Sequence, residues 1–128
     1  MKNGTLMALM LVLLTSCAPD SKLPPISSMP EDLQPYVEGL RNENPDMRWQ
    51  AAQELGFRGS ESKPAMPFLI AALCDTNERV QLFSVMALGA IGPEAKEALP
   101  ALERLAQETS SEDLKRAVKK AVFRIRRT

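Results

Sequence analysis

Apolar and polar residues alternate along residues 31–128 with the spacing of amphipathic helices. Between Leu114 and Ile125 the apolar residues recur three or four positions apart, so they share one stripe of a helix. The stretch from Val80 to Ile91 repeats this spacing and adds apolar residues on its flanks, as expected of a central helix covered from both sides. The pattern predicts helices over residues 46–57, 77–90 and 111–126.

These three helices are copies of one pattern. The pair Leu55-Gly56 lies 33 residues before Leu88-Gly89, and a weaker third copy around Val122 lies 34 residues further on. A period in this range is the signature of stacked helical units. Since one hairpin of this size cannot bury its own apolar stripe, its stability should come from contacts with the next hairpin.

A second kind of helix begins at prolines, over residues 35–40, 67–73 and 100–105. Proline suits the first helical turn because its missing N–H would have no partner there. It also disfavours α geometry in the residue before it, so residues 93–98 are predicted to form a separate short turn. We expect Gly59 and Gly92 to end the preceding helices with a left-handed residue, and Gly56 and Gly89 to allow close helix packing.

Together these elements predict an all-α domain, a short α-solenoid of about three antiparallel helical hairpins. The outer faces of the first and last helices are polar, as caps require. Trp49 lies off the apolar stripe of its helix, and we expect it to pack between adjacent hairpins, with a contact to a partner as the alternative.

The N-terminus reads as an export signal. Residues 1–16 place one lysine before an apolar run that is too short to span a bilayer as a stable anchor. The ending before Cys17 resembles the lipobox of bacterial lipoproteins, which implies cleavage before Cys17 and lipid on its thiol; an ordinary signal peptide with a chance cysteine is the alternative. Residues 17–30, rich in proline and serine, are predicted to be a tether, and 31–128 the folded domain. In a Gram-negative source, Ala18 would favour the outer membrane, facing the periplasm.

Residues 75–102 closely resemble the HEAT-like repeats first associated with phycobilisome lyases. They carry an aspartate, a valine, a leucine-glycine pair, an isoleucine-glycine pair and a proline-led second helix. The chain departs from the family pattern at Glu54, Gln81, Phe123 and Arg126. The resemblance implies an α-solenoid with a protein-binding surface; it does not imply lyase chemistry.

The composition offers little for catalysis. The chain has no histidine, which removes the common triads, and no glycine-rich phosphate loop. We therefore predict no catalytic, cofactor-binding or metal-binding residues. Lysine and arginine balance aspartate and glutamate at 16 each, so overall charge indicates no polyanionic partner. Cys74 is expected to be a small buried apolar residue with no disulfide partner once Cys17 carries lipid; a reactive thiol is the alternative.

The function predicted is that of a membrane-tethered module in the cell envelope that binds a protein partner. By analogy with other solenoids, the proline-led helices should line the concave side, and the candidate partner-binding residues there are Glu38, Arg41, Phe68, Ile70, Glu103 and Arg104. One alternative is a lyase-related or chromophore-handling protein that depends on Cys74. Another is a structural component that binds cell-wall polymer, or anionic head groups, through the basic helix at 111–126. That helix has one aromatic residue, Phe123, so no nucleic-acid partner is expected.

Overall fold

The computed structural model of the protein describes residues 23–127; the predicted signal sequence and Cys17 lie outside them. This part of the chain contains no β-strand, which confirms the all-α class. The α-helices are α2 (Gln34–Leu40), α3 (Pro45–Arg58), α4 (Met66–Ala72), α5 (Glu78–Ile91), α6 (Leu99–Glu108) and α7 (Glu112–Arg126). The 3₁₀ segments are η2 (Ile26–Ser28), η3 (Gly59–Ala65) and η4 (Gly92–Ala98).

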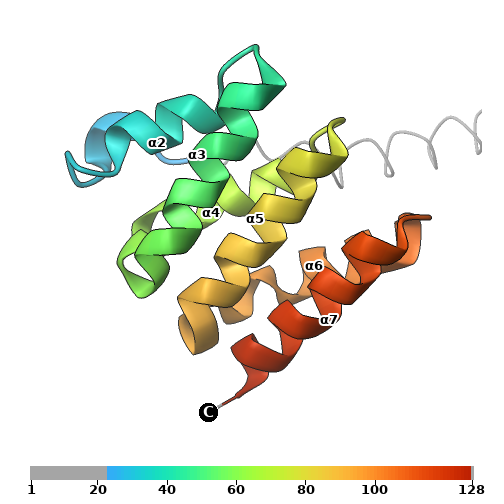
Figure 1. Cartoon of the computed structure of the whole chain (residues 1–128). Helices are drawn as coiled ribbons and strands as arrows, with labels where there is room; N and C mark the ends of the chain where they lie inside the picture. The colour runs from blue at the N-terminus through green and yellow to red at the C-terminus, as the bar shows by residue number, and fades with distance from the viewer. Residues whose placement is uncertain (1–22, 128) are drawn as a thin grey trace, which may run out of the picture.

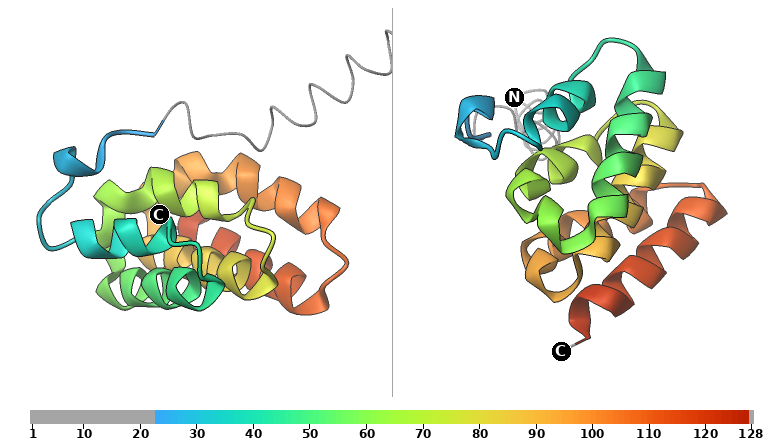
Figure 2. Two further views of the ribbon diagram at one scale, coloured as in Figure 1. Left: turned by 90° about the horizontal axis from the view of Figure 1, so that it is seen from above. Right: turned by 60° about the vertical axis from the view of Figure 1, so that its left-hand side comes forward.

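The helices form three hairpins, α2–α3, α4–α5 and α6–α7, stacked into a short solenoid (Figure 1). The second helices of the hairpins, α3, α5 and α7, lie side by side in one layer, and α5 packs directly against both neighbours. The proline-led helices lie behind this layer (Figure 2). The predicted solenoid of three antiparallel hairpins is therefore confirmed.

Each helix of the α3/α5/α7 layer begins with the same polar turn. A side chain caps the helix by accepting a hydrogen bond from a backbone N–H of the first turn, and the caps are Asn44, Asn77 and Ser111. The N–H of each cap in turn donates to a side chain two residues earlier; these acceptors are Asn42, Asp75 and Thr109. The repeat of the sequence is thus also a repeat of loop hydrogen bonds.

One ion pair joins successive loops. Arg48 donates through Nε and one terminal nitrogen to the two carboxylate oxygens of Asp75, at 2.8 and 3.1 Å, and also to two backbone carbonyls of the loop before α3. One repeat later, Gln81 stands in the place of Arg48 and Thr109 in the place of Asp75. With no carboxylate to pair, Gln81 donates instead to the carbonyl of Leu73. The ion pair between Arg48 and Asp75 is therefore not repeated one unit later.

The connections between hairpins bend as predicted, at glycine. Gly59 and Gly92 have positive φ values of 59° and 82°, but their ψ values of −128° and −145° lie outside the compact left-handed helical region. Backbone that combines a positive φ with a strongly negative ψ is nearly restricted to glycine. The separate short turn predicted over residues 93–98 is confirmed as η4, but the expected loss of α geometry before proline is not seen, because Met66 and Leu99 adopt α-helical dihedrals and begin α4 and α6.

Glycine also brings the front helices close together, as expected. A Cβ added to Gly56 would lie 3.5 Å from the Cα of Ala87, an ordinary contact. One added to Gly89 would lie 3.1 Å from both Cα and Cβ of Ala121, which is too close without movement. The α5–α7 contact is therefore the tighter of the two.

Residues 23–30, assigned to the tether on composition, contact the domain. Leu23 and Ile26 pack against the core, and Met29 is 9% exposed. The following turn is fixed to the end of α3 by Arg58, which bonds to Asp32 and to the hydroxyl of Tyr36. The hydrogen bond to Tyr36 raises the pKa of the Arg58 guanidinium, so this side chain stays charged.

Candidate functional site

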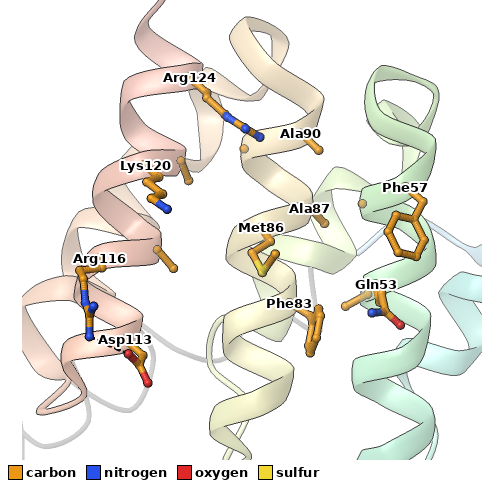
Figure 3. A pocket seen from close by; sticks show the side chains of 15 residues that line it. Gln53, Phe57, Phe83, Met86, Ala87, Ala90, Asp113, Arg116, Lys120 and Arg124 are labelled. Carbon is orange, nitrogen blue, oxygen red and sulfur yellow. Dashed lines mark hydrogen bonds and ion pairs between the residues drawn. The ribbon is translucent and has the colours of Figure 1, made fainter.

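A groove of about 550 Å³ runs across the α3/α5/α7 layer (Figure 3). Its wall on α3 and α5 is apolar and its wall on α7 is polar and mostly basic. The residues that line it are Ala52, Gln53, Gly56, Phe57, Phe83, Met86, Ala87, Gly89, Ala90, Asp113, Arg116, Ala117, Lys120, Ala121 and Arg124. We call this feature the groove.

The floor of the groove consists of small residues. Gly56 and Ala87 meet where α3 crosses α5, and Gly89 and Ala121 meet where α5 crosses α7. The groove is therefore a by-product of close helix packing, because residues without long side chains leave the space above the contact empty.

The apolar wall is formed by Phe57, Phe83 and Met86. Phe57 is 76% exposed and Met86 52% exposed, a large share for side chains of this kind. Phe83 is partly buried because its ring stacks on Trp49, with the ring centroids 5.2 Å apart. The stacking on Phe83 of α5 confirms a packing role for Trp49 between hairpins, and the indole N–H donates to Asp46 on its own helix.

The opposite wall carries three exposed cations on one face of α7, Arg116, Lys120 and Arg124. Arg116 bonds to Asp113 at 2.8 Å, and both side chains are more than 70% exposed, so this pair contributes little to stability. Lys120 and Arg124 form no ion pair within residues 23–127. The groove therefore combines apolar surface on one side with uncompensated positive charge on the other.

The six predicted partner-binding residues lie on the other layer. Glu38, Arg41, Glu103 and Arg104 are exposed and Ile70 is half-buried. The structure corrects the prediction for Phe68, whose side chain is 2% exposed and belongs to the core. It is buried because α4 packs against α2, α5, η3 and η4. The expectation that the proline-led helices line the hollow side does not describe this groove, which lies on α3, α5 and α7. Whether the exposed residues bind a partner stays a prediction.

The groove residues were missed for a definable reason. The expectation that this helix is covered from both sides is confirmed, since α5 packs against α3 and α7, but the Met86 side chain lies on a part of α5 that stays open to solvent. A usable signal exists in Phe57, which lies one repeat before Ala90 and off its own buried stripe. A large aromatic residue at a position where the next copy has alanine indicates a surface role or a mismatch in packing.

Cys74 differs from the prediction, since it is disulfide-bonded. The sequence has one other cysteine, Cys17, which lies outside the described residues. A thiol that carries lipid cannot also form a disulfide, so the state of Cys74 bears directly on the predicted lipidation. A reactive-thiol role would require reduction first.

The described residues contain no group of three or more cysteine, aspartate or glutamate side chains placed to hold a metal ion. None of the helices between residues 23 and 127 combines the length and apolar composition needed to cross a membrane.

Comparison with known proteins identifies the repeat. A family described as HEAT repeats matches residues 33–122, which covers every helix from α2 to α6 and most of α7. No curated protein matches the chain, and no solved structure does.

Proposed function

Because this chain belongs to the HEAT-repeat family, we propose that it is a protein-binding module held at the membrane by lipid on Cys17 and that the groove is its binding surface. HEAT repeats commonly mediate protein–protein interactions, and the family is generally non-catalytic. A solenoid of this kind binds through the shape and side chains of a preformed surface, with little ordering on binding.

The observation that carries the proposal is the open apolar wall of the groove. Two of the large exposed apolar side chains of the described residues, Phe57 and Met86, lie on it within one continuous surface. Contiguous apolar surface that is exposed to water marks interaction sites in soluble domains. Exposed aromatic and methionine side chains are also enriched at protein interfaces.

Attachment to the membrane and a role in the cell envelope are supported by the sequence alone. The apolar run of residues 6–14 ends just before Cys17, in the position that lipid attachment requires. In a Gram-negative source the module would sit on the outer membrane and face the periplasm.

Site-specific photo-crosslinking in the native cell tests the binding surface. A crosslinking amino acid is placed at Phe57 and Met86 in the groove, at Glu38 and Glu103 on the proline-led layer, and at Lys119 on the far side of α7 as the control. We expect one protein to be captured from both groove positions and not from Lys119.

Capture of the same protein from Glu38 and Glu103 alone would move the binding surface to the proline-led layer. With the protein expressed and localised normally, the lack of any protein adduct from the groove positions would contradict the proposal.

A further inference from the structure

The two walls of the groove differ in chemistry, and we infer that its occupant is an amphipathic helix of a partner protein with acidic residues along one flank. This inference rests on the proposed function and names the chemical class of the partner. It follows from the shape of the groove, the position of its apolar wall and the charge of α7.

The shape fits a helix. Packed helices lie about 8–10 Å apart, so α3 and α7 stand about 16–20 Å apart on either side of α5. A helix with its side chains is about 10–12 Å across, and it can lie over α5 between these two neighbours. The floor is made of glycine and alanine, which allows such a helix to approach closely.

The apolar contact has a defined side. Phe57, Phe83 and Met86 come from α3 and α5, with their side chains on that half of the groove in Figure 3. A docked helix would bury an apolar stripe against them, with anchors spaced three or four residues apart, as in other complexes where a helix lies in a groove.

The charge then fixes the other flank of the ligand. Lys120 and Arg124 are one helical turn apart, exposed and without an ion pair within the described residues, and Arg116 continues the same row. Acidic side chains on the ligand, also one turn apart, would face this row. The complementarity should raise the association rate and select acidic helices over basic ones.

A matched pair of peptides tests this. Each has about 18 residues, enough for about five helical turns, and the same leucine stripe; one carries glutamates along its flank and the other lysines. Binding to the full chain is measured by fluorescence anisotropy at about 0.15 M salt. We expect the glutamate peptide to bind at least about tenfold more tightly than the lysine peptide, and more weakly as salt rises.

Two double variants locate the site on α7. Lys120→Glu with Arg124→Glu reverses the groove side, and Lys115→Glu with Lys119→Glu makes the same change on the far side of the same helix. The first double variant should lower the affinity for the glutamate peptide by at least about tenfold and raise the affinity for the lysine peptide. The second should change either affinity by less than about threefold. Met86→Ser should weaken binding of both peptides, because it removes the shared apolar contact without changing the charge of the groove.

Equal binding of the two peptides, no binding of either, or equal effects of the two double variants would overturn the inference. Vesicles containing phosphatidylglycerol are the further probe. Binding to them that is lost on reversing Lys120 and Arg124 would assign the groove to a lipid surface and also overturn it. If crosslinking from Phe57 captures a protein through a segment that is not an acidic helix, the proposed function stands and only this inference fails.

Discussion

Ser84 lies on α5 with its side chain fully buried, and its hydroxyl has no hydrogen-bond partner among the described residues. The equivalent position one repeat earlier is Ala51. An unpartnered buried hydroxyl costs about 1–3 kcal/mol. We predict that Ser84→Ala stabilises the domain by about 1 kcal/mol and raises Tm by about 4 °C in thermal unfolding followed by circular dichroism.

Ser62 is the matched control, since it is equally buried but its hydroxyl donates to the carbonyl of Leu55 at 2.6 Å. Ser62→Ala leaves that carbonyl without this donor, so it should lower stability by about 1 kcal/mol. A fall in Tm for Ser84→Ala would mean that its hydroxyl has a partner, such as an ordered water.

Single residues also mark where sequence reasoning reached its limit. Trp49 was placed correctly because an off-stripe tryptophan in a stacked repeat has a neighbouring helix to meet. Phe68 was placed on the surface although it is buried, since an apolar stripe shows which face of a helix meets its nearest neighbour and not how many other elements cover the remaining faces. That depends on the three-dimensional stacking.

At the scale of elements, the two glycines in helix contacts should tolerate alanine to different degrees, because the helices are packed more closely at one contact than at the other. We predict that Gly56→Ala is neutral or stabilising by up to about 1 kcal/mol, because alanine is the better helix former and its Cβ would meet Ala87 at 3.5 Å. Gly89→Ala gains the same propensity but places a Cβ 3.1 Å from the backbone of α7, so it should be less stable than Gly56→Ala by at least about 1 kcal/mol. Urea unfolding of the two variants measures this difference.

If Gly89→Ala were as stable as Gly56→Ala, α7 would have to move away from α5 at little cost. The groove would then be adjustable in width, contrary to a preformed site. The measurement therefore tests stability and the rigidity of the groove together.

The bounds of the elements were predictable because their end signals are local. Prolines begin α4 and α6 within one residue of the expected place, and Gly59 and Gly92 end α3 and α5 as expected. α6 runs to Glu108 rather than to residue 105. The extra turn was missed because no glycine or proline marks the place where this helix ends. The loop hydrogen bonds of Asn44, Asn77 and Ser111 could have been read from the sequence as caps.

For the whole molecule, the repeat predicted the solenoid but not which side of it would be hollow. The groove arises from the crossing points of α3, α5 and α7, where small residues from different repeats meet. No single repeat contains that information, since each supplies only one helix of the groove. The face was therefore assigned by analogy, and the structure places the groove on the other layer.

The proposed lipid anchor on Cys17 would limit how far the domain can lie from a membrane. Among the described residues, contacts with the core begin at Leu23, six residues after the predicted lipid site. Six residues span at most about 20 Å. Lipid on Cys17 would therefore hold the solenoid next to the bilayer and limit partners to those present at its surface.

This arrangement makes lipidation testable with the two cysteines as a matched pair. We predict that the full chain incorporates an alkyne-tagged fatty acid in a bacterial host, detected by fluorophore coupling and electrophoresis. The label should be lost in Cys17→Ser and retained in Cys74→Ser, because only the residue after the apolar run meets the processing machinery. Since Cys74 is disulfide-bonded and lipid on Cys17 would exclude that thiol as its partner, an unlabelled wild-type chain whose mobility changes on reduction would contradict the lipid anchor.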